Sequence, residues 1–321
     1  MKITIISLDN WGYNEYIVAE LKTFKQVEVN HINFDKLRYK YPSIIHKIFN
    51  FFLKNIFNSS LKRKHLNRII LSKVKSLGYQ NKILVIKSEF LSIKTIKELK
   101  ENTSELIAFY NDNIQRCPRI KKVHPYFDIN YSFEKKDALK YNFNYITNYI
   151  YHKHLQKKPD LSTKIKFELF NISSLGKRNT ILEKVALALD KIHANYKIII
   201  VGKKKYTPKG GIIYQSEKID IEGVNDYISK SRTLLDVHRK GQSGLTFRVM
   251  DSLAFQKKLI TTNQDIINYD FYNPNNILVI DPNDVEIPKM FFETNYESIP
   301  QNIYDKYTIG NWVKTVFQLD E

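Results

Sequence analysis

Cysteine is almost missing from this chain of 321 residues, and Cys117 alone cannot form an intrachain disulfide or a cysteine zinc site. Proline (nine) and glycine (ten) are also scarce, which excludes collagen-like and low-complexity chains. No apolar run reaches the roughly 18 residues that a membrane-spanning helix needs. The first expected strand begins at Lys2, so we expect no signal peptide. Together these absences favour a soluble, intracellular protein.

Acidic residues are outnumbered by basic ones, 33 to 51, which gives a formal charge of +18. A charge of this size favours attraction to polyanions or to an anionic membrane. Lysine, asparagine and isoleucine are abundant together, however, and an AT-rich genome produces that mixture without selection for any partner. The distribution of the charge along the chain is therefore more informative than its total.

Apolar, β-branched runs alternate with helical patterns through the first half of the chain, as in doubly wound α/β proteins. A length of 321 residues predicts about two domains at roughly 150 residues each. The strands expected in the first domain are Lys2–Leu8, Val27–Asn33, Lys82–Lys87, Glu105–Tyr110, Phe127–Phe133 and Tyr145–Tyr149. Helices are expected from the turn after the first strand to Phe24, at Ile93–Lys100 and at Lys135–Tyr141.

The alternation restarts after Leu155–Lys166, a stretch with proline, serine and charges but no periodicity, which we interpret as a linker. The strands expected beyond it are Phe167–Ile172, Lys197–Val201, Ile212–Tyr214, Thr233–Val237, Lys258–Thr261 and Asn276–Ile280. Helices are expected at Asn179–Ala194, Gly244–Ala254 and Asp305–Phe317. The sequence thus predicts an N-terminal domain (1–155), a second α/β domain (156–304) and a terminal helix (305–321).

One segment departs from this alternation. Residues 36–75 hold eleven Lys and Arg and no Asp or Glu, and Ile45, Phe49, Phe52, Leu53 and Ile56 share one helical face. One interpretation is a helical pair whose apolar face packs on the domain while its basic face is solvated. The other is a basic amphipathic surface that contacts anionic lipid or a lipid-linked anionic substrate.

Several familiar sites lack their defining residues. The chain has no GxGxxG after the first strand and no GxxxxGK[ST], GxSxG or HExxH motif, which argues against dinucleotide, P-loop, hydrolase and zincin chemistry. We expect no carboxylate partner near the pair His152 and His154, and we interpret the pair as surface structure in preference to a metal site. No metal-ligand cluster is expected.

A glycine-containing loop in the second domain is the strongest candidate site. The run DVHRKGQSGLT leads from the end of a strand through this loop into a helix, a junction that directs backbone N–H groups and a helix N-terminus toward one place. Arg239, Arg248 and the turn Gly176–Arg178 add cationic donors suited to a diphosphate. Asp251, within the helix, could accept hydrogen bonds from ribose hydroxyls.

The run GLTFRVMDSLAFQKKLITTN in the same region resembles the donor-binding segment of GT-B glycosyltransferases, particularly bacterial capsular and lipopolysaccharide synthesis proteins. In that family's E-x7-E pattern Asp251 stands at the second acidic position, and Ser243 replaces the first. FELFNISSLGKRNTILEKV is similar to the start of the family's C-terminal domain. KILVIKSEF and ELIAFYNDNIQRCP are similar to parts of its N-terminal domain, where Asp112 matches an Asp after the fourth strand.

The resemblance implies two Rossmann-like domains that face each other across a cleft, with a C-terminal helix crossing back to the first. Its donor side comprises Gly176, Lys177, Arg178, Gly202, Arg239, Gln242, Ser243, Gly244, Leu245, Thr246, Arg248 and Asp251. The acceptor side would include Asp9, Trp11 and Lys87. The expected general base is Asp112, with Glu89 as second choice.

The function that these observations favour is transfer of a sugar from a nucleotide-sugar donor to a capsule or lipopolysaccharide glycan, without metal or other cofactor. The acceptor would be a glycan or lipid-linked glycan, and the enzyme would bind the cytoplasmic face of the inner membrane peripherally. The alternative is a non-catalytic protein that binds polyanions or nucleic acid through the basic segment. Because the aromatic residues there have helical spacing, nucleic acid is not the expected partner. The oligomeric state is left open.

Overall fold

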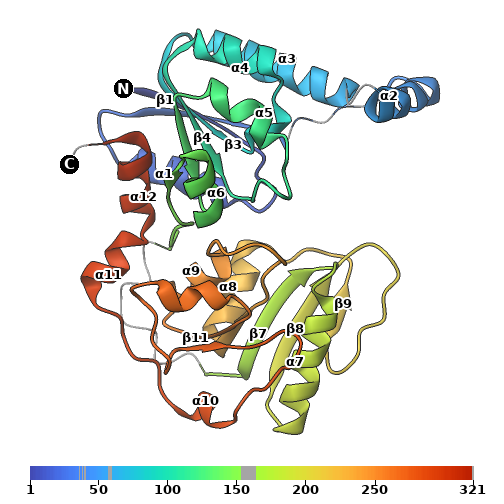
Figure 1. The fold of residues 1–321 in the computed structure, drawn as a ribbon, viewed down its shortest axis with the longest axis vertical. Helices are drawn as coiled ribbons and strands as arrows, with labels where there is room; N and C mark the ends of the chain where they lie inside the picture. The colour runs from blue at the N-terminus through green and yellow to red at the C-terminus, as the bar shows by residue number, and fades with distance from the viewer. Residues whose placement is uncertain (36, 38, 40, 57–59, 153–163, 320–321) are drawn as a thin grey trace. The chain divides into compact units, whose positions relative to one another are not determined.

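The chain folds into two compact units, each built on its own sheet (Figure 1). The structure, a computed structural model, describes residues 1–35, 37, 39, 41–56, 60–152 and 164–319, with the side chains of 53–56 excepted. The first unit holds Met1–Thr147 and the chain from Val313 onward, and the second holds Asn148–Trp312.

The first unit is a six-stranded parallel sheet in the order β2-β1-β3-β4-β5-β6. Its elements are β1 (Lys2–Ser7), α1 (Tyr13–Leu21), β2 (Glu28–Asn33), α2 (Ile44–Ile56), α3 (Leu61–Ser76), β3 (Gln80–Ile86), the 3-10 turn η1 (Ser88–Phe90), α4 (Ile93–Lys100), β4 (Thr103–Tyr110), α5 (Ile120–Val123), η2 (His124–Tyr126), β5 (Ile129–Ser132), α6 (Lys135–Tyr141) and β6 (Asn144–Tyr145).

The second unit is also a six-stranded parallel sheet, in the order β12-β11-β10-β7-β8-β9. Its elements are β7 (Phe167–Ser174), α7 (Asn179–Lys191), β8 (Tyr196–Val201), β9 (Ile213–Gln215), α8 (Ile221–Ser229), β10 (Ser231–Asp236), α9 (Phe247–Ala254), β11 (Lys258–Thr261), η3 (Gln264–Asn268), β12 (Ile277–Val279), α10 (Met290–Glu293), α11 (Gln301–Lys306) and α12 (Ile309–Phe317).

Both sheets are buried on their two faces, which is why their strands appear in the sequence as continuous apolar runs. In β7, Leu169 packs with α7 on one face, while Phe170 packs with α8 and α9 on the other. Leu234 and Leu235 of β10 divide in the same way. Successive side chains of a strand point to opposite faces, so each strand contributes to two hydrophobic layers. The α/β architecture predicted from the sequence is confirmed.

The division between the units lies earlier than the expected boundary at residue 155. Ile150 is buried in the core of the second unit, and its N–H donates to the Tyr307 carbonyl at 2.7 Å. The second unit therefore begins at Asn148, directly after Thr147. Most of the expected linker, residues 155–163, lies outside the described residues.

The C-terminal region also differs from the single helix expected at Asp305–Phe317. It forms two helices, α11 and α12. Thr308 lies between these helices in the sequence and pairs with Ile150 in an isolated parallel bridge. The last part of α12 belongs to the first unit, where the Tyr131 hydroxyl donates to the Thr315 carbonyl at 3.2 Å.

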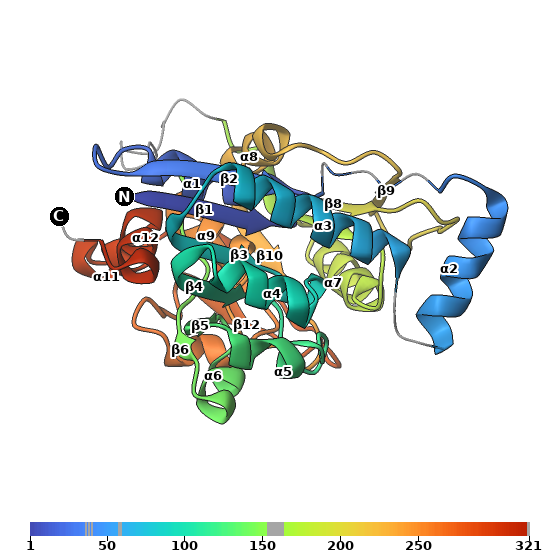
Figure 2. The ribbon, with the colours of Figure 1, turned by 90° about the horizontal axis from the view of Figure 1, so that it is seen from above.

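The basic segment forms α2 and α3, which pack differently. Ile70 and Val74 of α3 are buried in the first unit's core. By contrast, α2 lies at the margin of that unit beyond the start of α3 (Figure 2), with Ile45 77% and Phe49 54% exposed. The interpretation in which the apolar face of a helical pair packs on the domain is therefore confirmed for α3 and wrong for the described side chains of α2. No helix in the described ranges has the length and apolar character needed to cross a bilayer.

Candidate functional site at the carboxyl ends of the strands

The second unit's sheet has its switch point between β7 and β10. From these neighbouring strands the chain proceeds outward in opposite directions, to β8 and β9 on one side and to β11 and β12 on the other. Ligands of open α/β sheets bind beyond the carboxyl ends of the strands at such a point. Two loops predicted to be functional, 175–178 and 237–246, begin there.

A buried polar cluster fixes the second of these loops. Asp236 accepts a hydrogen bond from the Thr246 hydroxyl at 2.9 Å, and its other oxygen lies 2.8 Å from Nδ1 of His238. His238 Nε2 is 2.9 Å from the Gly244 carbonyl. Burial alone would raise the pKa of Asp236, but His238, Thr246 and Arg178 outweigh it and lower the pKa. The ionised Asp236 carboxylate thus contacts both ends of the loop 237–246, here called the glycine loop.

Arg178 connects the two loops across the switch point. Its Nη1 donates to the Val237 carbonyl at 2.9 Å, so its guanidinium is occupied with positioning the backbone. The N–H of Gly176 donates to Asn179 Oδ1 at 3.1 Å, which closes the turn before α7. Lys177, between them, is exposed.

The glycine loop itself presents cations and backbone at the surface. Arg239 and Lys240 are exposed at its start. Gly241 has φ +80°, a left-handed conformation that a side chain disfavours, and the Gln242 N–H donates back to the Arg239 carbonyl at 3.0 Å. The Ser243 carbonyl accepts from Asn263 at 3.1 Å. Leu245 is also tied down, since its carbonyl accepts from Asn148 at 2.8 Å.

Arg248 and Asp251 engage each other inside the unit. Asp251 is 1% exposed, and its oxygens accept from the Tyr151 hydroxyl at 2.9 Å and from Arg248 Nη1 at 3.1 Å. His152 Nε2 lies 3.6 Å from the same carboxylate. The expectation that His152 lacks a carboxylate neighbour is therefore wrong; His154 lies outside the described residues. The donor-binding roles of Arg248 and Asp251 stay predictions.

Gly202 follows β8 and is required by close packing. A Cβ on it would stand 2.6 Å from the Cβ of Leu175, and its N–H donates to the Gln215 carbonyl at 2.9 Å. The residue therefore allows the 175–178 loop to approach β8, and its contact with a donor stays a prediction.

The first unit has its own switch point between β1 and β3. After β1, Asp9 accepts from the N–H groups of Gly12 and Asn14, both at 2.8 Å, so its carboxylate fixes the start of α1. Trp11, in the same turn, is 42% exposed. Lys87 follows β3 with φ +66°. Asp9, Trp11 and Lys87 thus lie at the carboxyl edge of the sheet, and their contact with an acceptor stays a prediction.

The two candidate base residues lie together at this edge. Burial raises the pKa of Glu89, and Asp112 raises it further, while Lys87 and the Cys117 thiol oppose the change. Asp112 differs, because both of its oxygens accept from Arg116 Nη1 at 2.7 Å. Burial, then Glu89 and Asp112, raise the pKa of Cys117 to about 12, so its thiol is neutral.

Sequence reasoning missed three residues that organise these edges. His238 and Asn263 hold the glycine loop, and Arg119 donates from Nε to the Glu89 carbonyl at 2.8 Å. The Asp-x-His spacing of DVH, at the end of a strand, is a signal that could have indicated His238. The positions of Asn263 and Arg119 depend on contacts between distant segments.

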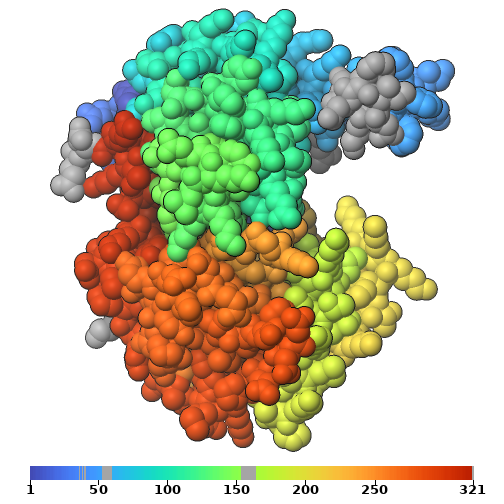
Figure 3. Space-filling model, viewed as in Figure 1, coloured from blue at the N-terminus to red at the C-terminus, as the bar shows by residue number. Residues whose placement is uncertain are grey.

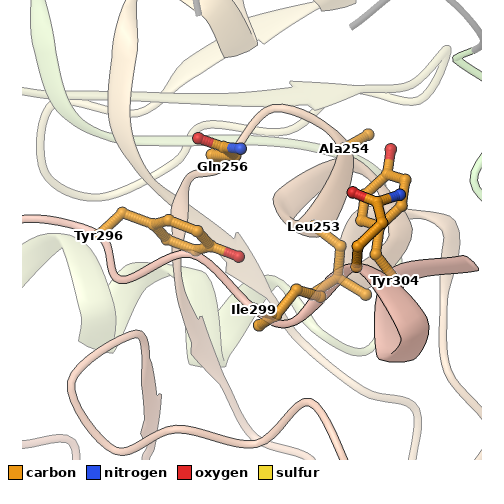
Figure 4. A pocket seen from close by; sticks show the side chains of 7 residues that line it. Leu253, Ala254, Gln256, Tyr296, Ile299 and Tyr304 are labelled. Carbon is orange, nitrogen blue, oxygen red and sulfur yellow. The ribbon is translucent and has the colours of Figure 1, made fainter. Parts of the chain in front are cut away.

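A small hollow elsewhere in the second unit is separate from these loops. It has a volume of about 80 Å³ and lies at the end of α9, where Leu253 and Gln256 meet Tyr296 and Tyr304 (Figure 4). Because α9 begins at the glycine loop and ends here, the hollow is at the opposite end of the helix. Among the described residues no group of three or more His, Cys, Asp or Glu could hold a metal ion.

Similarity to known proteins is found in structure alone, since neither a family model nor a curated protein matches the sequence. An α-glucosyltransferase solved with UDP and a 13-mer DNA superposes with a TM-score of 0.60 at 12% identity, covering 99% of this chain and 98% of that one. The N-terminal domain of Candida albicans trehalose-6-phosphate phosphatase matches with a TM-score of 0.60 at 11% identity, covering 99% and 96%. UDP-GlcNAc 2-epimerase from Neisseria meningitidis gives 0.56 at 9%, covering 99% and 99%.

The chain has the GT-B fold. Both halves of that fold are present as parallel six-stranded sheets, and both carry their candidate residues at the switch point.

Proposed function

We propose that this protein is a glycosyltransferase that moves a sugar from a nucleotide-sugar donor to a bacterial surface glycan of the capsule or lipopolysaccharide type. The observation that carries the proposal is the switch point of the second unit, where exposed Lys177 and Arg239 stand beside the starts of α7 and α9. Cations and helix N-termini together suit a diphosphate. The UDP in the solved α-glucosyltransferase supports the same ligand class.

The proposed reaction needs a base and a stabilised leaving group. A carboxylate takes the proton of the acceptor hydroxyl, the oxygen forms a bond to the anomeric carbon, and the bond from that carbon to the diphosphate breaks. The diphosphate leaves with the electron pair, and Lys177, Arg239 and the helix starts stabilise its charge without a metal.

Glu89 suits the role of base better than Asp112, which reverses the order expected from the sequence. Both oxygens of Asp112 already accept from Arg116 Nη1, so this carboxylate is engaged in an ion pair within the protein. Glu89 has its pKa raised by burial, and a base whose pKa lies nearer neutrality accepts a proton more readily at physiological pH.

The protein is also proposed to bind the cytoplasmic face of the inner membrane peripherally, where a lipid-linked acceptor would reside. The support comes from two helices. In α2, Ile44, Ile45, Phe49 and Phe52 are exposed, and α3, the next helix in the sequence, has Lys and Arg residues but no Asp or Glu. Exposed aromatic and aliphatic residues next to lysine and arginine favour the interface of an anionic bilayer.

Calorimetry with UDP and CMP tests the donor site. Arg239→Ala should weaken binding of the preferred nucleotide by about 1.5–3 kcal/mol, because a charge-assisted contact to phosphate is lost. Lys191→Ala, an equal charge change at the far end of α7, is the matched control and should bind normally. Equal affinity in all three proteins would contradict the assignment.

Turnover completes the test. We expect release of nucleotide from a nucleotide sugar, with acceptor-dependent stimulation that survives EDTA. An epimerised nucleotide sugar as the product would contradict glycosyl transfer, and a loss in EDTA that magnesium restores would contradict metal independence.

A further inference from the structure

A basic hollow of about 410 Å³ lies in the first unit between α3 and α4, whose surfaces are light blue and turquoise in Figure 3. We call it the α3/α4 hollow. Five of its lining residues are cationic and one is acidic: Arg63, Lys64, Arg68, Lys94, Arg119 and Glu98. It lies outside the donor loops of the second unit, and Arg63, Lys64 and Arg68 belong to the basic segment 36–75.

Two helices begin at its rim. Ser60 caps α3 by accepting from the Arg63 N–H at 3.4 Å, and Ser92 caps α4 by accepting from the Thr95 N–H at 3.1 Å. Both serines line the hollow, so two positive helix ends add to the side-chain charge there.

Asn67 holds the two helix starts in place. This residue is 5% exposed, and its amide donates to the Arg63 carbonyl at 2.8 Å and to the Phe90 carbonyl at 3.2 Å. Its oxygen accepts from the Ser92 N–H at 2.7 Å. The hollow is therefore fixed by buried hydrogen bonds between α3, η1 and the start of α4.

Within the part of the chain that the structure describes, most of the cations that line the hollow have no carboxylate partner. Glu98 is already paired with Lys75, at 3.1 Å. Among the described residues, Arg63, Lys64, Arg68 and Lys94 form no ion pair with a carboxylate. Burial and then the nearby Arg63 lower the pKa of Arg119, while the Glu89 carboxylate opposes the change, so the guanidinium groups of Arg63 and Arg119 lie close enough to repel each other. Like charges held together in this way favour an anionic ligand.

Arg119 connects the hollow to the candidate base. It donates from Nε to the Glu89 carbonyl at 2.8 Å and from Nη2 to the Leu91 carbonyl at 3.0 Å, which positions its guanidinium at the back of the hollow. Arg119 thus lines the hollow and is also hydrogen-bonded to the turn 87–91 that carries Glu89.

We propose that the α3/α4 hollow binds a phosphate or diphosphate group of the acceptor, a proposal that rests on the function proposed above. The acceptor is then an anionic glycan, whose phosphate is held by Arg63, Arg68, Lys94 and Arg119 while its hydroxyl is presented to Glu89. That phosphate can belong to a membrane lipid that carries the glycan or to a soluble phosphorylated glycan.

Binding of inorganic pyrophosphate to the full chain, measured with saturating UDP so that the donor site is filled, tests the hollow separately from the donor site. The variant is Arg63→Gln/Lys94→Gln, and its matched control is Lys73→Gln/Lys97→Gln, an equal charge change on the same two helices. We expect wild type and control to bind pyrophosphate, and the variant to bind at least about tenfold more weakly while its UDP affinity is unchanged.

The proposal would be overturned if wild type did not bind pyrophosphate, or if variant and control bound it equally. If wild type does not bind UDP, the result refutes the donor site but does not contradict the proposal for the hollow. Single-stranded DNA provides a further test. If both double substitutions weaken DNA binding and pyrophosphate does not displace the DNA, the proposal is also overturned, since a general polyanion-binding surface would then explain the charge.

Vesicles identify the source of the phosphate. Suppose that wild type floats with vesicles that contain phosphatidic acid, that pyrophosphate inhibits this flotation, and that the Arg63→Gln/Lys94→Gln variant does not float. This result supports a lipid-borne phosphate. Pyrophosphate binding without such flotation supports a soluble phosphorylated acceptor.

Discussion

At the level of single residues, Arg239 and Arg248 carry the same charge in different surroundings. Arg239 is exposed at the start of the glycine loop, whereas Arg248 is 12% exposed and pairs with Asp251, which is 1% exposed. Its guanidinium also lies over the Phe170 ring at 5.5 Å. Substituting Arg239 should therefore affect a ligand, and substituting Arg248 should affect the fold.

We expect Arg248→Ala to lower the free energy of unfolding by on the order of 3 kcal/mol, because it leaves a buried carboxylate without its cation. Chemical denaturation of the variant measures this loss. In the double variant Arg248→Ala/Asp251→Asn part of the stability should return, since the buried charge is gone. Unchanged stability of Arg248→Ala together with lost UDP binding would mean that this guanidinium contacts the donor instead.

The raised pKa of Glu89 predicts opposite pH dependences of stability and activity. The folded state holds the proton more tightly than the unfolded state, whose carboxyl titrates near 4.5, so stability falls as pH rises from that value through the folded pKa. Glu89→Gln should therefore melt at a higher temperature than wild type at pH 7–8, with no difference near pH 4.

Turnover should increase with pH through the same raised pKa in wild type and be lost in Glu89→Gln. Asp112→Asn is the comparison, because the structure places that carboxylate in an ion pair with Arg116. A Glu89→Gln variant that retains turnover, beside an inactive and stable Asp112→Asn, would return the role of base to Asp112.

At the level of elements, α2 and α3 have similar composition but different environments. The sequence 36–75 is apolar and basic throughout, yet Leu66, Ile70 and Val74 of α3 are buried while Phe49 and Phe52 of α2 are more than half exposed. Asn50 connects the helices, since its side-chain oxygen accepts from the Leu61 N–H at 2.7 Å. An exposed apolar face of this kind indicates an interaction surface.

The pair Phe49→Ser/Phe52→Ser should leave the melting temperature nearly unchanged, because neither side chain is in the core, and should abolish binding to anionic liposomes at low salt. Ile70→Ser/Val74→Ser on α3 is the contrasting pair and should unfold the protein, since both residues are buried. Liposome flotation and thermal denaturation measure the two outcomes. A marked loss of melting temperature in the first pair would show that α2 packs on protein, and wild type that ignores anionic liposomes would refute the membrane proposal.

At the level of the whole molecule, the two units repeat one design with different chemistry. Each is a parallel sheet with its candidate residues after neighbouring strands, β1, β3 and β4 in the first unit and β7 and β10 in the second. The first unit presents carboxylates there, Glu89 and Asp112, and the second presents Lys177 and Arg239. An acceptor base and a diphosphate site are the functions that we propose for these two sets of charges.

The sequence alone determined the architecture, because strands of a parallel sheet are buried on both faces and therefore appear as apolar runs such as KILVI and ELIAFY. It also located the glycine loop and the carboxylates, since residues after such strands reach the carboxyl edge of the sheet. Only the tertiary structure decided the contacts between distant segments. These include Asp251 with Tyr151 and His152, Arg119 with the Glu89 carbonyl, and Thr308 with Ile150. The periodicity of apolar residues predicts which face of an element is apolar, but it does not identify the segment that packs against that face. The exposure of α2 and the basic hollow beside α3 were therefore visible only in the tertiary structure.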